Sequence, residues 1–159
     1  MNKIITLQKI TQVIKSVHNT GKSIVLVGGC FDILHIGHIK FLEEAKKTGD
    51  ILLVLLESDP KVKKLKGKNR PYFTQKERAQ VIASLLYTDY VILLPEINQD
   101  RDYERLVMQL KPDIIAVTEN DPLLKKKKHQ ADVAGSRLKT VPFIKTFSSS
   151  RLAKILGME

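Results

Sequence analysis

Short apolar runs of strand length recur along the chain and alternate with segments of helical periodicity. The runs occupy residues 23–27, 51–56, 90–94, 113–117 and 138–143. Because most of these runs are apolar at nearly every position, they are typical of strands that are buried on both faces of a parallel sheet. The pattern therefore predicts an α/β fold, namely a single Rossmann-like, doubly wound parallel sheet of five strands with helices on both faces.

The segments between these runs carry apolar residues three and four positions apart, which predicts helices. The predicted helices cover residues 7–17, 38–47, 74–86, 101–110 and 148–156. Thr74 and Glu77 have the spacing of a capping box at the start of the third helix. Pro112 stops the fourth helix, because proline cannot continue a helical hydrogen-bond ladder.

The length of 159 residues fits one domain of ordinary size. We expect a single domain over residues 1–159, with an N-terminal helix in 1–20, a Rossmann-like core in 21–147 and a C-terminal helix in 148–159. No apolar run approaches the roughly 18 residues that a membrane-spanning helix needs. The first residues also lack the apolar core of a signal peptide, so we expect a cytoplasmic protein without a membrane partner.

The charge balance points to a polyanionic partner. The chain has 27 basic and 17 acidic residues, for a net charge of +10, and such a balance favours a nucleic acid, an anionic surface or a phosphorylated small molecule. Six basic residues and no acidic residue lie in 61–70, and four lysines form the run 125–128. The single cysteine, Cys30, excludes an internal disulfide framework and a cysteine-rich zinc site.

The most informative segment is the turn from Gly28 to His38, which follows the first buried strand and opens a helix. Glycines at the start of the turn permit a ligand to approach the backbone closely, and the N-terminus of the following helix favours an anion. His35 and His38 lie three residues apart with Gly37 between them, so a phosphate chain is the expected occupant. The alternative is that both histidines only pack or cap the helix.

Three separated motifs resemble known enzymes. The run Gly29-Cys30-Phe31-Asp32, followed by His35-Ile36-Gly37-His38, resembles the HxGH signature of the nucleotidyltransferase superfamily that contains cytidylyltransferases and adenylyltransferases. The residues from Ser58 to Gly67, with Arg70-Pro71 and Glu77-Arg78-Ala79, are similar to the bacterial heptose 1-phosphate adenylyltransferase domain. Phe147-Ser148-Ser149-Ser150 resembles the second signature of the superfamily, a hydroxyl-rich turn that opens the last helix.

The resemblance implies a reaction in which a phosphate oxygen of an acceptor attacks the α-phosphorus of a nucleoside triphosphate and pyrophosphate leaves. It implies Mg²⁺ on the triphosphate, with no protein side chain assigned to the metal. The catalytic residues that it implies are His35, His38 and Lys63. The nucleotide- and phosphate-binding residues that it implies are Gly29, Cys30, Phe31, Asp32, Gly37, Lys66, Arg70, Arg78, Ser148, Ser149 and Ser150. A solvated loop is the alternative interpretation of the lysines.

Two departures from the family pattern affect substrate recognition. The loop implied to contact the base or the acceptor consists of Thr118, Glu119, Asn120 and Asp121, where heptose enzymes have a Lys-Gly-Gly-Asp-Tyr pattern. This difference predicts altered acceptor or base recognition, with the lysines of 125–128 as a substitute source of positive charge. Ala153 stands where many members have a basic residue, and Arg151 or Lys154 is its candidate replacement.

Several functions stay open within this interpretation. The leading one is adenylyl transfer from ATP to a sugar 1-phosphate of the heptose 1-phosphate type. Cytidylyl transfer from CTP to glycerol 3-phosphate and adenylyl transfer to flavin mononucleotide are the alternatives. A non-catalytic nucleic-acid-binding protein is the alternative from another class, but aromatic residues for base stacking are not interleaved with the basic segments. Relatives are often dimers, and the sequence leaves a homodimer open.

Overall fold

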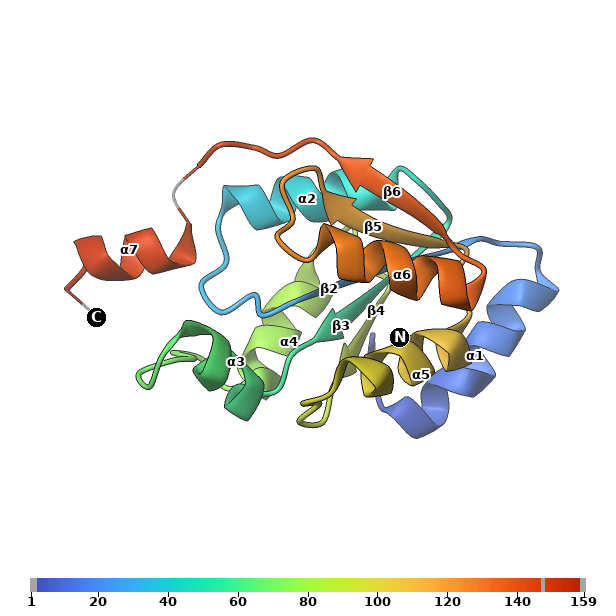
Figure 1. The fold of residues 1–159 in the computed structure, drawn as a ribbon, viewed down its shortest axis with the longest axis horizontal. Helices are drawn as coiled ribbons and strands as arrows, with labels where there is room; N and C mark the ends of the chain where they lie inside the picture. Colours follow the sequence, from blue (N-terminus) through green and yellow to red (C-terminus); the bar gives the residue numbers. More distant parts are fainter. Residues whose placement is uncertain (1–2, 147, 158–159) are drawn as a thin grey trace.

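Six parallel strands form one sheet at the centre of the computed structural model, which describes residues 3–146 and 148–157 (Figure 1). The strands lie in the order β1-β4-β3-β2-β5-β6. Their bounds are Ile4–Ile5 for β1, Ile24–Gly29 for β2, Ile51–Leu56 for β3, Tyr90–Leu93 for β4, Ile114–Thr118 for β5 and Arg137–Val141 for β6. The chain adds β3 and then β4 on one side of β2. It then adds β5 and β6 on the other side of β2, so that β2 and β5 are adjacent strands.

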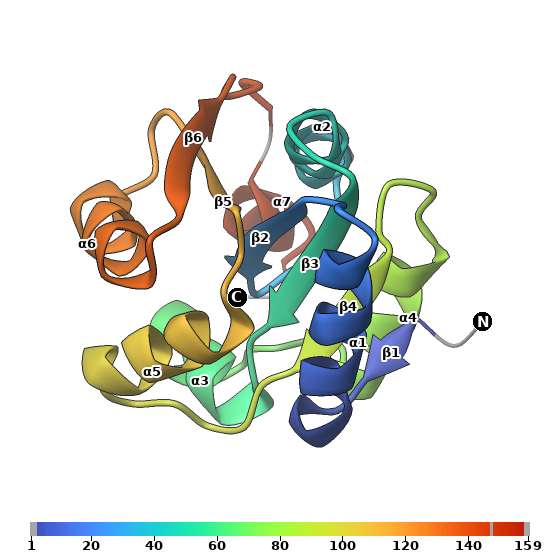
Figure 2. The ribbon, with the colours of Figure 1, turned by 90° about the vertical axis from the view of Figure 1, so that its right-hand side faces the viewer.

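Helices connect the strands and cover both faces of the sheet (Figures 1 and 2). Their bounds are Leu7–Asn19 for α1, Ile36–Lys46 for α2, Asp59–Lys66 for α3, Gln75–Ser84 for α4, Asp100–Leu110 for α5, Leu124–Ala134 for α6 and Ser149–Ile155 for α7. Buried side chains of α1, α5 and α6 pack on one face of the sheet, and those of α2 and α4 pack on the other. Helices α3 and α7 lie beyond the carboxyl ends of the strands (Figure 1).

The burial of the strands explains their apolar sequences. In β3, the five residues from Leu52 to Leu56 are all buried, and their side chains alternate between the two apolar cores. Strand β2 behaves in the same way from Ile24 to Val27. Since both faces are covered by helices, neither strand can tolerate the polar alternation of a half-exposed sheet.

The predicted α/β class is confirmed, but the predicted number of strands is wrong by one. Strand β1 is only two residues long, and it adds an edge to the sheet by pairing Ile4 with Val91 and Ile5 with Ile92 of β4. Two residues are too few to show a strand pattern, so the segment before Leu7 carried no recognisable signal. Among the described residues, no helix is both long enough and apolar enough to cross a membrane.

Helices α3 and α6 lie in the two lysine-rich segments, where the sequence pattern did not predict a helix. Helix α3 begins after Ser58, whose Oγ accepts a hydrogen bond from the backbone N–H of Lys61 at 3.4 Å. The residues of α3 include Val62, which is fully buried, so the lysine-rich segment is anchored helix rather than solvated loop. Helix α6 contains the whole 125–128 run, and its residue Ala131 is fully buried in the apolar core.

Candidate functional site at the carboxyl ends of the central strands

A crevice opens where the two central strands of the sheet separate. Strand β2 pairs with β5 only through Val25 and Leu26, whereas it pairs with β3 as far as Gly29. The carboxyl ends of β2 and β5 are therefore free of each other. This is the topological switch point of a doubly wound sheet, the place where such folds bind ligands.

The turn after β2 is shaped by a close contact between Gly29 and Phe31. Phe31 has the left-handed φ of 45°, which is uncommon for a residue other than glycine, and its side chain is buried. A Cβ atom on Gly29 would lie 2.8 Å from Cε2 of the Phe31 ring. Position 29 therefore has no room for a side chain, which explains the glycine at the end of the strand.

His35 and His38 cap the start of helix α2 through their Nδ1 atoms. Nδ1 of His35 accepts a hydrogen bond from the backbone N–H of Gly37 at 3.2 Å, and Nδ1 of His38 accepts one from the backbone N–H of His35 at 3.4 Å. The two rings stack with their centroids 3.8 Å apart. A Cβ atom on Gly37 would lie 3.0 Å from the His35 ring, so glycine permits this packing.

This capping fixes the chemical state of both rings. Because Nδ1 is an acceptor in each, the neutral ring carries its proton on Nε2, and the Nε2–H group remains as a donor. Burial, together with the charges of His35 and Lys66, lowers the pKa of His38 from 6.5 to about 3. Burial and Lys66 also lower the pKa of His35. Capping and ligand binding are thus compatible: the site presents two neutral N–H donors.

Asp32 holds the turn in place from the protein interior. Its Oδ2 atom accepts a hydrogen bond from Nε of Arg70 at 2.5 Å, and the side chains of this pair are 0% and 1% exposed. Its Oδ1 atom accepts bonds from the backbone N–H groups of Tyr72 at 2.9 Å and Phe73 at 3.4 Å. Asp32 and Arg70 therefore join the histidine turn to the segment before α4.

Arg78 forms a second interior clamp. Its guanidinium donates hydrogen bonds to the backbone carbonyls of Cys30, Glu57 and Phe73 and to the carboxylate of Asp59. Arg78 is 1% exposed, so these donors face protein groups. For Arg70 and Arg78, both predicted to bind phosphate, the observed partners are interior groups that position the turn.

Lys66 is the lysine that the structure places beside the histidines. Its Nζ atom donates a hydrogen bond to Oγ of Ser149 at 3.3 Å, and its charge acts on His35, His38 and Cys30. One lysine therefore links the three motifs that are separated in the sequence. Lys63, the lysine predicted to be catalytic, is exposed, and its side chain has no hydrogen bond or ion pair among the described residues.

The serine-rich turn begins helix α7 as predicted, and its serine hydroxyls make different contacts. Oγ of Ser148 accepts a hydrogen bond from the backbone N–H of Arg151 at 3.2 Å, so Ser148 is the cap. Ser150 is half-buried, and Ala153, which stands where many members have a basic residue, is fully buried. Phe147, the first residue of the predicted motif, lies outside the described residues.

The loop after β5 uses two of its acidic side chains for structure. Oε1 of Glu119 accepts a hydrogen bond from the backbone N–H of Phe143 at 3.2 Å. Oδ1 of Asp121 accepts one from the backbone N–H of Leu123 at 2.7 Å, just before α6. Thr118 ends β5, and Asp121 is the member of the predicted 118–121 loop that lines the central pocket.

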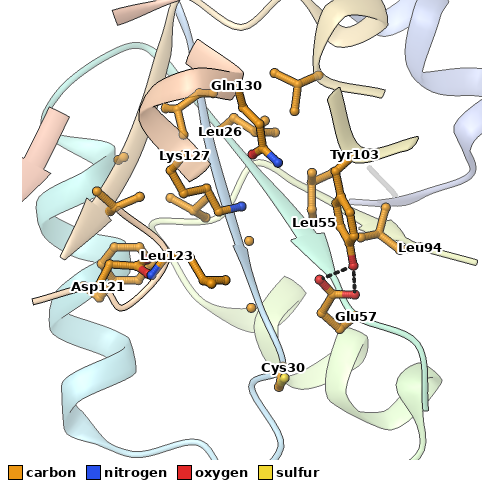
Figure 3. A pocket seen from close by; sticks show the side chains of 18 of the residues that line it. Leu26, Cys30, Leu55, Glu57, Leu94, Tyr103, Asp121, Leu123, Lys127 and Gln130 are labelled. Atoms are coloured by element: carbon orange, nitrogen blue, oxygen red, sulfur yellow. Dashed lines mark hydrogen bonds between the residues drawn. The ribbon is translucent and has the colours of Figure 1, made fainter. Parts of the chain in front are cut away.

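That central pocket has a volume of about 180 Å³ and lies between the ends of β2, β3 and β5 and the helices α5 and α6 (Figure 3). We call it the switch-point pocket. Its polar lining includes Glu57, Tyr103 and Lys127. Lys127 belongs to the 125–128 run noted in the sequence, whereas Glu57 and Tyr103 were not singled out as site residues. Glu57 directly follows the apolar run 51–56, so its place at a strand's carboxyl end was the signal that could have identified it.

The donor set of the site fits a triphosphate rather than a metal cage. Among residues 3–146 and 148–157, no group of three or more histidine, cysteine, aspartate or glutamate side chains is placed to hold a metal ion. The carboxylate nearest the histidine turn, that of Asp32, is occupied by Arg70 and two backbone N–H groups. A metal ion at this turn would therefore need ligands other than these side chains.

The lowered pKa of His38 predicts a specific dependence of stability on pH. Between pH 6.5 and about 3 the unfolded chain binds a proton at this ring and the folded chain does not. Stability therefore falls as the pH drops through this range. Replacing His38 with Asn, which keeps a side-chain acceptor for the backbone, is expected to flatten the decline. Urea unfolding midpoints of both proteins at pH 7 and pH 4.5 measure it, and parallel declines would contradict the prediction.

A sheet of this topology, with a histidine pair and a lysine at its switch point, defines a class of nucleotide-binding α/β protein. Residues 26–151 match the family model described as Cytidylyltransferase-like. The chain belongs to this family.

Curated relatives carry the same type of domain within longer chains. The chain is 46% identical over 110 residues to "Bifunctional protein HldE" of Aliarcobacter butzleri, a match that covers 69% of this chain and 22% of the relative. It is 36% identical over 159 residues to the protein of the same name from Citrifermentans bemidjiense, covering 98% of this chain and 32% of the relative. The chain thus spans about a fifth to a third of the length of these relatives.

Solved structures show the same architecture. The lipopolysaccharide core biosynthesis protein from Thermoplasma volcanium superposes with a TM-score of 0.63 at 30% identity, covering 80% of this chain and 100% of that chain. Pantoate-beta-alanine ligase from Francisella tularensis superposes with a TM-score of 0.69 at 16% identity, covering 97% of this chain and 73% of that chain. The second similarity shows the fold alone.

Proposed function

We propose that this protein transfers an adenylyl group from ATP to a sugar 1-phosphate of the heptose 1-phosphate type. The observation that carries the proposal is the convergence of His35, His38 and Lys66 beside the opened end of β2. These groups are donors and a cation, with no activated nucleophile among them, which suits phosphoryl chemistry driven by positioning and charge stabilisation. The similarity to proteins named HldE supports a sugar phosphate as the acceptor.

In the proposed reaction, an oxygen of the acceptor phosphate attacks the α-phosphorus of ATP. A new P–O bond forms as the bond to the bridging oxygen of the β-phosphate breaks, and pyrophosphate leaves with that electron pair. The Nε2–H groups of His35 and His38 and the ammonium of Lys66 stabilise the negative charge that grows on the phosphate oxygens. The N-terminus of α2 adds its dipole to the same site.

The remaining predicted residues have supporting roles in this proposal. Lys63 and the hydroxyls of Ser149 and Ser150 contact the outer phosphates, and the 118–121 loop borders the base and the acceptor. Magnesium accompanies the triphosphate, and the reaction takes place in the cytoplasm, where nucleoside triphosphates are available. The protein needs no nucleic-acid or membrane partner for this chemistry.

A coupled pyrophosphate assay tests the proposal. ATP and CTP are each paired with heptose 1-phosphate, glycerol 3-phosphate and flavin mononucleotide, all with Mg²⁺. The highest turnover is expected for ATP with heptose 1-phosphate. Pyrophosphate release with CTP and glycerol 3-phosphate, or with ATP and flavin mononucleotide, would assign the alternative activity, and no release from any pair would refute nucleotidyl transfer to these acceptors.

The departures in the 118–121 loop predict a kcat/KM for heptose 1-phosphate below about 10⁴ M⁻¹s⁻¹. A higher value in the same assay would refute the hypothesis that acceptor or base recognition is altered.

The position of Lys66 predicts that it matters more than Lys63. Replacing Lys66 with Ala is expected to lower kcat/KM for ATP about tenfold or more, because a charge-assisted hydrogen bond to phosphate is lost. Lys63→Ala should have a smaller effect, because this side chain is exposed and only Lys66 acts on both histidines. Lys68→Ala removes the same charge from an exposed position and serves as the control. Equal losses for Lys63→Ala and Lys66→Ala would contradict the ranking.

A further inference from the structure

The switch-point pocket is not used by the phosphate chemistry described above, yet it is built with opposed polar walls. It is continuous with the turn, since Gly28, Gly29 and Cys30 form part of its lining. Its volume of about 180 Å³ is below the 300–1,000 Å³ of pockets for drug-sized ligands, so its occupant is a small metabolite or one end of a larger molecule.

Lys127 is the lysine of the 125–128 run that faces this pocket. Lys126 forms an ion pair with Asp100 at 2.7 Å, and Lys125 and Lys128 are exposed to solvent. The side chain of Lys127 instead extends into the pocket (Figure 3). Its Nζ atom would lie 3.9 Å from a Cβ atom built on Gly28, which places the ammonium over the end of β2.

The ammonium of Lys127 has no hydrogen bond or ion pair within the described part of the chain. Burial lowers its pKa, although the carboxylates of Asp121 and Glu57 act in the opposite direction. A cation that is withdrawn from water and not directly paired is costly to the folded protein. Such a group is suited to an anion that arrives with a ligand.

Glu57 and Tyr103 form the opposite wall of the pocket (Figure 3). The Tyr103 hydroxyl donates to the Glu57 carboxylate, with Oη 2.9 Å from Oε1 and 2.8 Å from Oε2. Burial raises the pKa of Glu57. Each carboxylate oxygen has a second lone pair, so Glu57 can still accept a hydrogen bond from a hydroxyl of a ligand. As a carboxylate it would repel a phosphate.

We propose that the switch-point pocket binds the acceptor, with Lys127 as the ligand of its phosphate and the Glu57–Tyr103 pair as the ligand of its hydroxyl groups. The two walls orient the molecule: the phosphate lies beside Gly28 near the end of β2, and the hydroxyl-bearing carbons point toward α5. Apolar side chains, including Leu55, Leu94 and Leu123, contact the carbon skeleton between the two ends. The inference rests on the proposed function and adds the residues that select the acceptor.

The test compares Lys127→Met with Lys128→Met, which removes the same charge from an exposed position of the same helix. The acceptor is whichever member of the panel above the unaltered protein turns over fastest. Lys127→Met is expected to raise the acceptor KM about tenfold or more, because one charge-assisted contact is lost. The Kd for ATP with Mg²⁺, measured by calorimetry without acceptor, should change less than about twofold in the same variant. Lys128→Met should change neither quantity.

A second measurement separates binding from stability. Because Lys127→Met removes a desolvated charge, its melting temperature should equal or exceed that of the unaltered protein. An unchanged acceptor KM in this folded variant would overturn the inference and leave the proposed function intact. If the unaltered protein releases pyrophosphate with no acceptor of the panel, the proposed function fails, and the acceptor assignment fails with it.

The hydroxyl wall is tested by Glu57→Gln, which keeps the size of the side chain and removes its charge. A site built to bind a hydroxyl strongly rejects an analogue that lacks it. We therefore expect the preference of the enzyme for heptose 1-phosphate over its analogue lacking one hydroxyl to fall about tenfold at the affected position. A preference that is unchanged at every hydroxyl would show that Glu57 does not contact the acceptor.

Discussion

Replacing His38 with Ala is expected to lower kcat about a hundredfold or more while the protein remains folded. The reason is that His38 presents a fixed Nε2–H donor, held by its Nδ1 contact to the backbone of His35 and by the packing of its ring against Phe31 and His35. Removing one preorganised donor to transition-state charge costs about 10²–10³ in kcat in enzymes that use such donors. His35→Ala should act in the same direction, with a larger effect on ATP binding.

The control for this experiment is His129→Ala. His129 is exposed and lies 3.5 Å from the carboxylate of Glu104, away from the histidine turn. Its replacement should leave kcat unchanged. Steady-state pyrophosphate release at saturating ATP and acceptor measures all three proteins, and circular dichroism confirms their folding. Near-native kcat in both His35→Ala and His38→Ala would refute the assignment of the site.

Replacing Asp32 with Ala is expected to cost about 3–5 kcal/mol of unfolding free energy, because it leaves the buried Arg70 charge without its carboxylate. The same change frees the backbone N–H groups of Tyr72 and Phe73, which Asp32 now satisfies. Since unfolding free energies of small domains are about 5–15 kcal/mol, the loss is a large part of the total. Urea unfolding at pH 7 gives the measurement.

Asp59→Ala is the matched comparison for Asp32→Ala. Asp59 also pairs with a buried arginine, Arg78, at 2.7 Å, but its own side chain is 41% exposed. Arg78 keeps three backbone carbonyl partners after the change. The expected loss is therefore below about 1 kcal/mol, as for exposed pairs. Equal losses at positions 32 and 59 would show that burial of the Asp32–Arg70 pair does not set its energetic importance.

The core of the fold was predictable because its signal is local and strong. The runs 51–56 and 113–117 are apolar at almost every position, and the structure places them as the strands β3 and β5, buried on both faces. The alternation of such runs with helices fixes a parallel sheet with crossover connections. Strand β1 was missed because two residues show no periodicity, and it exists only through its pairing with β4.

The histidine turn was also readable from the chain, since its residues are close in sequence and have a characteristic spacing. The lysines were not separable in this way. Lys63 and Lys66 belong to the same run, and their order along the chain does not show which one faces the histidines. Helix α3 turns Lys66 toward Ser149 of α7, and the exposed Lys63 has no such contact.

By itself, then, the sequence determined the α/β class, the strand-to-helix turn with its two histidines and the serine cap of the last helix, because each depends on residues that are neighbours along the chain. Only the tertiary structure decided that Arg70 and Arg78 face the interior and that Glu57, Tyr103 and Lys127 line one pocket. Glu57 directly follows β3, Tyr103 lies in α5 and Lys127 lies in α6, so the three residues are far apart in the sequence. The physical reason is that the separation of β2 and β5 creates the pocket, and strand separation depends on the packing of the whole sheet.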